Sequence, residues 1–109
     1  MAITYKVLGQ SAPSATTNTD VYTVGAGKQA TVSTITVCNR STTAATYRIA
    51  IRVAGSALSN EEYIAYDATV AANDTVSLTI GVTLGAADVI TVYASTANLS
   101  VNIFGAEIA

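Results

Sequence analysis

The chain has no histidine and no tryptophan, and only one cysteine and one proline among its 109 residues. Without histidine, the Ser-His-Asp and Cys-His catalytic arrangements are excluded, and so is the commonest protein metal ligand. The single cysteine, Cys38, excludes an intrachain disulfide and a cysteine-based metal site built by one chain. We expect Cys38 to be a buried, inert thiol. We also expect no enzyme activity and no catalytic residue, and the first interpretation includes no cofactor and no metal-binding residue.

Charged residues are scarce as well. They make up 11% of the chain, with five cations, seven acids and a net charge of −2, whereas soluble domains contain roughly 25%. Because the cations form no block, the charge pattern argues against a nucleic-acid partner. No apolar run approaches the roughly 20 residues of a membrane span. The first residues do not form a secretory signal, so we expect the chain to stay in the cytoplasm where it is made.

What the chain does contain is typical of β-structure. Half of its residues are apolar, and the abundant Val, Ile and Thr are β-branched residues that suit a pleated surface. About eight short strands follow one another at roughly ten-residue spacing. This pattern predicts an all-β fold, a single-domain antiparallel β-sandwich or jelly roll over residues 1–109. Residues 9–20, which hold the only proline, form a loop or an extended arm.

Several segments carry specific structural expectations. Residues 30–39 form a long strand whose alternation slips, so either a bulge near Ser33 and Thr34 resets the phase or a threonine points inward. A short polar connection predicts that this strand forms an antiparallel hairpin with residues 46–53. Further expectations are a strand over 75–84 with a bulge or bend at Gly81, a central strand over 89–94 and a small tail over 105–109.

The strand over residues 46–53 places two cations on one face. Tyr47, Ile49, Ile51 and Val53 alternate with Arg48, Ala50 and Arg52, so the arginines should point outward. Together with nearby Arg40 they could bind an acidic partner in a bidentate manner. The alternative is that they prevent edge-to-edge pairing of sheets or simply form a solvated face. Tyr63 and Tyr66 differ in phase, so at least one should be exposed and able to anchor an interface. The candidate partner-contact residues are Arg40, Arg48, Arg52 and Tyr63.

Acidic residues gather in the predicted loops. A glycosidase site needs two carboxylates that face each other across a cleft, and so small a β-module rarely provides one. A calcium site is the second interpretation, because oxygen-rich loops can collect a hard cation. The alternative is that these side chains are solvated turn residues. The carboxylate candidates are Glu61, Glu62 and Asp67, and the calcium candidates are Asn60, Glu61, Asp67, Asn73, Asp74 and Asp88.

Nearly the whole chain resembles a family of small virion proteins of tailed bacteriophages, including cyanophages. The similarity is carried by residues 5–10 (YKVLGQ), 20–24 (DVYTV), 32–40 (VSTITVCNR), 63–67 (YIAYD), 72–74 (AND) and 92–100 (VYASTANLS). A proline after Val24 would be more usual in that family, and its absence affects only the stiffness of the turn. These motifs are structural rather than catalytic.

The resemblance implies a non-enzymatic virion structural protein, made in the host bacterial cytoplasm and located in the virion. The first expectation is a capsid decoration, or cement, protein that binds the outer shell in many copies and stabilises it. Its partners would be copies of itself, as a trimer or other symmetric homo-oligomer, and the major capsid protein. One alternative is a tail, neck or fibre-associated subunit. Another is a carbohydrate-binding module for host attachment, which exposed aromatic residues in a concave loop cluster would favour.

Overall fold

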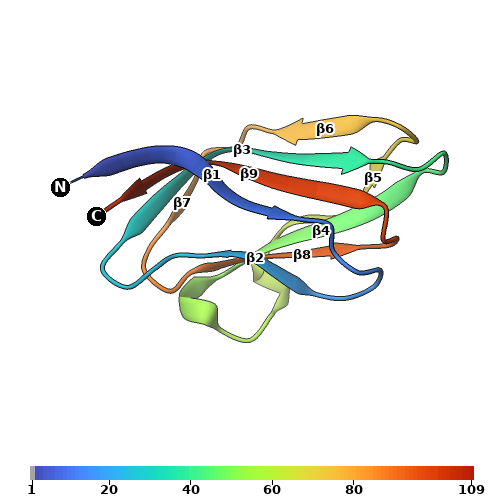
Figure 1. The fold of residues 1–109 in the computed structure, drawn as a ribbon. Helices are drawn as coiled ribbons and strands as arrows, with labels where there is room; N and C mark the ends of the chain where they lie inside the picture. The colour runs from blue at the N-terminus through green and yellow to red at the C-terminus, as the bar shows by residue number, and fades with distance from the viewer. Residues whose placement is uncertain (1) are drawn as a thin grey trace.

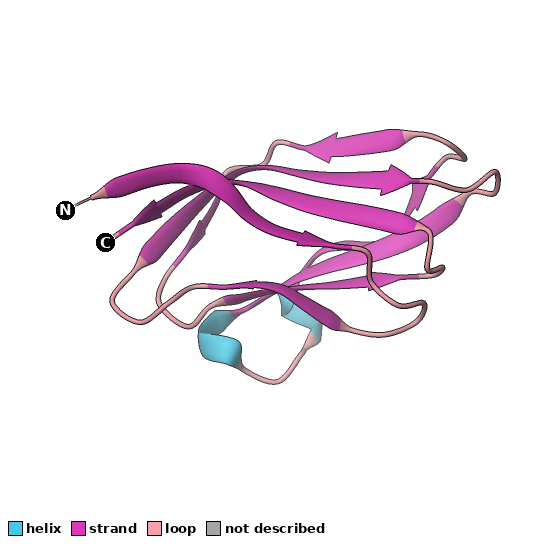
Figure 2. Ribbon diagram, in the orientation of Figure 1, coloured by secondary structure: helices cyan, strands magenta, loops and turns pink. Residues whose placement is uncertain are grey.

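A computed structural model describes residues 2–109. Almost all of its regular structure is β-strand (Figure 2). The strands are β1 (Ile3–Ser11), β2 (Thr19–Thr23), β3 (Gln29–Asn39), β4 (Ala45–Arg52), β5 (Tyr63–Val70), β6 (Thr75–Leu78), β7 (Val82–Leu84), β8 (Val89–Ala94) and β9 (Leu99–Ile108). Two single 3₁₀ turns, η1 (Val53–Gly55) and η2 (Asn60–Glu62), lie between β4 and β5.

The strands form two antiparallel sheets that pack face to face (Figure 1). Sheet A has the order β1-β9-β3-β6, with β7 also paired to β3, and sheet B has the order β2-β8-β4-β5. The pairing of the strands is nested from the two ends of the chain inward. β1 pairs with β9, β2 with β8, β3 with both β6 and β7, and β4 with β5. This is the arrangement of a jelly roll. The predicted all-β antiparallel sandwich is confirmed.

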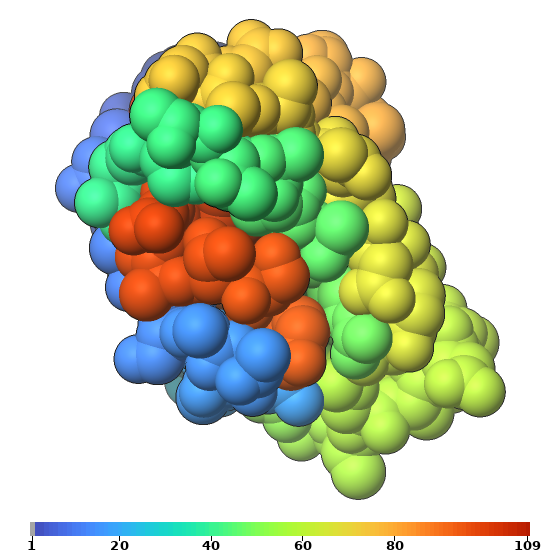
Figure 3. All heavy atoms as spheres, turned by 90° about the vertical axis from the view of Figure 1, so that its right-hand side faces the viewer, coloured from blue at the N-terminus to red at the C-terminus, as the bar shows by residue number. Residues whose placement is uncertain are grey.

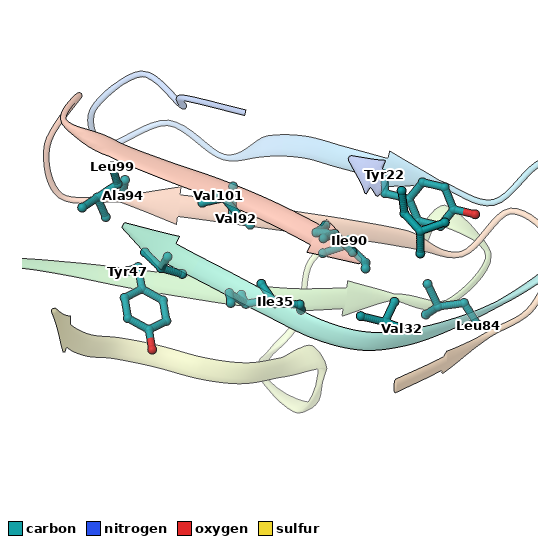
Figure 4. Close-up of a cluster of buried hydrophobic side chains, with 14 of the residues drawn as sticks. Tyr22, Val32, Ile35, Tyr47, Leu84, Ile90, Val92, Ala94, Leu99 and Val101 are labelled. Atoms are coloured by element: carbon teal, nitrogen blue, oxygen red, sulfur yellow. The ribbon is translucent and has the colours of Figure 1, made fainter. Parts of the chain in front are cut away.

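The core lies between the sheets. Alternate residues of each strand point inward and interdigitate with those of the opposite sheet (Figure 4). The fully buried large side chains come from both sheets and include Ile35, Ile49, Ile90, Leu99 and Ile103. Tyr47 is buried, as the sequence pattern predicts. β8 lies inside sheet B between β2 and β4, which confirms the central strand over residues 89–94.

The slipped alternation of β3 results from a bulge. Val32 pairs with Gly105 of β9, whereas Thr34 pairs with Phe104, so Ser33 is the extra residue. The bulge restores the phase, and both Val32 and Ile35 point into the core. Of the two expected explanations, the bulge near Ser33 is therefore the correct one.

The predicted hairpin between residues 30–39 and 46–53 is wrong, because β3 belongs to sheet A and β4 to sheet B. The short connection crosses from one sheet to the other instead of turning within one. A buried side chain supports the crossing: the Asn39 Nδ2 donates to the carbonyl oxygens of Thr43 and Val70, at 2.9 and 3.3 Å. Its Oδ1 accepts from the backbone N–H and the hydroxyl of Ser41.

Three further boundaries differ from the expectation. The strand over 75–84 is split into β6 and β7 by a bend at Gly81, whose φ is +62°, so there are nine strands rather than about eight. β4 ends at Arg52, and Val53 is 64% exposed in η1 rather than inward-facing. The expected tail over 105–109 belongs mostly to β9, which pairs with both β1 and β3 up to Ile108.

The two ends of the segment 9–20 belong to strands of the sandwich. Residues 9–11 lie in β1 and residues 19–20 in β2, which leaves 12–18 as the connection. Pro13 is buried, and the Thr16 N–H donates to the carbonyl oxygen of Ala94 on β8 at 2.8 Å. The connection therefore lies against its own domain.

A polar cluster lies at the end of the sandwich where β1 begins and β9 ends. The Tyr22 hydroxyl donates to Glu107 Oε2 at 2.7 Å, and Lys6 Nζ lies 2.9 Å from Glu107 Oε1. The Lys6 ammonium and the Tyr22 hydroxyl hold the pKa of Glu107 below its usual range. Burial, together with the adjacent Glu107 carboxylate, raises the pKa of Tyr22.

The lowered pKa of Glu107 predicts a loss of stability in acid. Because the folded-state pKa lies below the unfolded value of about 4.3, the Glu107 carboxylate stabilises the fold above that pH. This contribution disappears as the pH falls through the folded-state pKa. We expect urea midpoints measured between neutral pH and about pH 3 to fall less steeply for Glu107→Gln than for the wild type. Parallel curves would contradict this assignment.

Candidate functional site

The outer faces of the two sheets differ in charge. Among the residues of the sheet A strands, only Lys6 and Glu107 are charged. Lys6 is in register with Gly105, which in turn pairs with the inward-facing Val32. The side chain of Glu107 reaches Tyr22 of sheet B. Both charged residues therefore lie on the inner side of sheet A, and its outer face carries no charge.

Apolar side chains are exposed on this outer face. They lie on neighbouring strands, because Val7 of β1 pairs with Phe104 of β9 and Tyr5 pairs with Ala106. Tyr5 is 82% exposed. Threonine and asparagine side chains continue the surface over β3 and β9. We call this surface the neutral face and define it by Ile3, Tyr5, Val7, Thr31, Thr34, Thr36, Asn102 and Phe104.

Cys38 does not behave as predicted. It is in phase with Thr36 on the outward side of β3, whereas Val37 and Asn39 point into the core. Its side chain is therefore only partly buried. The bulge at Ser33 sets this phase, and an apolar composition alone does not reveal which residues of the strand face inward.

The outer face of sheet B is charged and aromatic. Arg48 on β4 is in register with Tyr93 on β8, and Ala50 is in register with Thr91 on β8 and Tyr63 on β5. Asp20 of β2 and Asp67 of β5 complete the surface. We call it the arginine–tyrosine face and define it by Asp20, Arg48, Arg52, Tyr63, Tyr66, Asp67, Thr91 and Tyr93.

Arg48 lies between two tyrosine rings. Its Cζ is 4.2 Å from the ring centroid of Tyr66 and 4.4 Å from that of Tyr93. Its Nε and Nη2 donate to the two carboxylate oxygens of Asp67, at 2.7 and 3.3 Å. The hydrogen bond with Asp67 raises the pKa of Arg48 further. The bidentate acidic contact expected for Arg48 is thus formed within its own chain.

Arg52 fastens a loop to sheet B. Its Nε donates to the Thr91 hydroxyl at 3.0 Å, and its Nη2 lies 3.0 Å from each carboxylate oxygen of Asp20. Its Nη1 donates to the carbonyl oxygens of Gly55 and Ser56. All three guanidinium nitrogens therefore bond to groups of the same chain, and only 18% of the side chain is exposed.

The other two candidate partner-contact residues lie in different places. Arg40 follows β3 in the crossing connection, and its Nη2 donates to the Ala97 carbonyl oxygen at 3.0 Å. Arg40 therefore shares no hydrogen-bonding partner with Arg48 or Arg52. Tyr63 belongs to the arginine–tyrosine face, where its ring packs edge-on against Tyr66 with centroids 4.9 Å apart. A bulge in β5 brings both tyrosines to this face.

The acidic residues are occupied in turns and ion pairs. Glu62 accepts from the Ser56 hydroxyl and the Ser59 N–H, and these hydrogen bonds lower its pKa. The Asp88 carboxylate accepts from the backbone of Ala54 and Gly85. Within residues 2–109 no three or more Cys, Asp or Glu side chains gather so as to hold a metal ion. The same residues form no helix that is long and apolar enough to cross a membrane.

Known proteins were compared with the chain by family, by sequence and by structure. No family model, no curated protein and no solved structure matches it.

The sequence did not identify the residues that complete these faces. Asp20 and Asp67 lie 32 and 19 residues from the arginines that they bind, and no local pattern links such distant positions. Tyr5 and Phe104 come from opposite ends of the chain and become neighbours only when β1 pairs with β9. The strict alternation of Ile3, Tyr5 and Val7 was a usable signal that one side of β1 is apolar.

Proposed function

We propose that this chain is a non-enzymatic structural protein of a tailed-bacteriophage particle, a decoration protein that binds the outer shell in many copies. The observation that carries the proposal is the neutral face: an uncharged sheet surface with exposed Tyr5, Val7 and Phe104. The resemblance of the chain to small virion proteins supports the same reading.

The chemistry of the neutral face suits permanent docking. The centres of stable interfaces are depleted in charge and enriched in aromatic residues, and burying this face removes no charged side chain from water. A shell presents the same site many times, so a symmetric oligomer of this chain binds several sites at once. A modest binding free energy per copy is then enough for a stable coat on the shell.

The proposal predicts a face-specific loss of shell binding. Tyr5→Glu places a charge among the exposed apolar side chains of the neutral face, and removing an interface anchor of this kind costs about 2 kcal/mol or more, roughly 30-fold in affinity. Tyr5 is 82% exposed, so the substitution should not disturb folding. The measurement is co-sedimentation of the purified chain with shells assembled without it.

The matched control is Tyr66→Glu, which alters an exposed tyrosine on the opposite sheet. We expect this variant to bind shells like the wild type. Equal binding by all three proteins would exclude the neutral face as the docking surface. Wild-type protein that ignores shells but sediments with isolated tails would replace the decoration assignment with a tail subunit.

A further inference from the structure

A small hollow lies on the outer side of sheet B, beside the arginine–tyrosine face. It measures about 220 Å³ and is lined by Asn18, Asp20, Arg52, Leu58 and Thr91. The loop that contributes Leu58 follows β4 and projects from the body of the sandwich, as Figure 3 shows in light green. The volume is below the roughly 300–1,000 Å³ of sites for drug-sized ligands, so the hollow admits one small ring or group at a time.

Three of the polar side chains around this hollow, those of Asp20, Arg52 and Thr91, are held by hydrogen bonds to one another. The Asp20 carboxylate accepts from Arg52 and from the Thr91 hydroxyl, the latter at 2.8 Å. The loop is fixed by Arg52 and by the Ala54 N–H, which donates to Asp88 at 2.8 Å. Groups that are already ordered lose little entropy when a ligand binds. The side of the hollow formed by Asp20, Arg52, Thr91 and the loop is therefore preorganised.

The remaining hydrogen-bonding capacity suits hydroxyl groups. A carboxylate has about four acceptor positions, and Asp20 uses three of them on Arg52 and Thr91 while its side chain is 54% exposed. The Asn18 amide supplies donors and an acceptor next to it. Leu58 adds an apolar wall. An acceptor, a donor and an apolar wall around one small space fit a ring that carries hydroxyl groups.

Aromatic rings continue this surface away from the hollow. Tyr93 lies two residues beyond Thr91 on β8, about 7 Å along the strand and on the same face. The exposed ring of Tyr66 lies across Arg48 from it. The C–H faces of a sugar can pack against such rings, and a ligand of more than one ring would reach from the hollow to the tyrosines.

The charge balance selects between classes of ligand. Arg48 is paired with Asp67 and Arg52 with Asp20, so the four charges of this face cancel. A phosphate, a nucleic acid or an acidic polysaccharide would find no free cation here. A neutral ligand would bury no unpaired charge.

We propose that the hollow and the adjoining tyrosines of sheet B form a binding site for a neutral oligosaccharide. The site lies on the opposite side of the sandwich from the neutral face, so a chain docked through sheet A would still display it. The two proposals are independent, because neither face contributes residues to the other.

The test uses the full chain, made tetravalent, on an array of neutral hexose and N-acetylhexosamine oligomers beside uronic-acid and sulfated ones. We expect neutral oligomers to bind. For the strongest of them, titration should show that Tyr66→Ala and Asn18→Ala each weaken binding about tenfold, whereas Tyr5→Ala leaves it unchanged. The absence of neutral binding, a preference for acidic oligomers, or undiminished binding by both site variants would each overturn the proposal. Loss of shell binding by Tyr5→Glu would not bear on it.

Discussion

Replacing Gly105 by alanine is expected to remove more than about 3 kcal/mol from the free energy of unfolding, the upper end of ordinary overpacking. A Cβ atom at this position would overlap the backbone carbonyl oxygen of Thr31 and lie 3.0 Å from the Cα of Val32. β9 lies between β1 and β3, so it cannot move away from one neighbour without disturbing the other. Because whole domains are stable by only about 5–15 kcal/mol, the effect should be plain in urea unfolding.

Gly25→Ala is the matched control for Gly105→Ala. Its Cβ would meet the side chain of Lys28 at an ordinary 3.5 Å, and its φ is not positive. We expect the urea midpoint of this variant to stay close to that of the wild type. If Gly105→Ala unfolds at the same urea concentration as Gly25→Ala, then β9 does not approach β3 as closely as the structure shows.

Asn39→Asp should be the second large loss, about 3 kcal/mol or more, because two buried hydrogen bonds become contacts between a carboxylate and carbonyl oxygens. Asn39 is 1% exposed, and its Nδ2 donates to both Thr43 and Val70. A carboxylate at this site cannot donate. The measurement is the free energy of unfolding in urea at neutral pH.

The pH dependence of Asn39→Asp distinguishes a charge effect from a packing effect. Burial disfavours the ionised carboxyl, so the variant should recover part of its stability relative to the wild type as the pH is lowered and the group is protonated. Asn102→Asp is the control, because Asn102 is less buried and uses its Oδ1 only as an acceptor from Gln10. We expect its stability to lie within about 0.5 kcal/mol of the wild type. Equal losses of unfolding free energy in Asn39→Asp and Asn102→Asp would show that Asn39 does not support the connection that crosses from β3 to β4.

The sequence identified only part of the candidate site. Alternation in residues 46–53 placed Arg48 and Arg52 correctly on an outward face, and the structure confirms it. The expected role was contact with an acidic partner, whereas the nearest acids prove to be Asp67 and Asp20 of the same chain. Their pairing leaves the neutral face of sheet A as the better surface for docking. The alternation in β1 signalled one part of that face, but no local pattern revealed the whole of it, because it combines β1 with β9.

The sequence by itself determined the features that depend on local geometry. Period-two alternation identified most of the strands, the slip near Ser33 and the buried position of Tyr47, because a pleated strand turns successive side chains to opposite faces. The bend at Gly81 was indicated by a glycine inside a strand pattern. Apolar residues in both phases also identified β8 as a central strand.

Only the tertiary structure decided which strands meet. Short connections are compatible with a turn within one sheet or a crossing between two, so the β3–β4 hairpin was a wrong prediction that no local pattern could have corrected. The nested pairing of a jelly roll joins the two ends of the chain, and this creates the bond between Tyr22 and Glu107, the tight approach at Gly105 and the uncharged outer face of sheet A. The physical reason is that these contacts depend on the closure of the whole sandwich, which is a property of all the strands together.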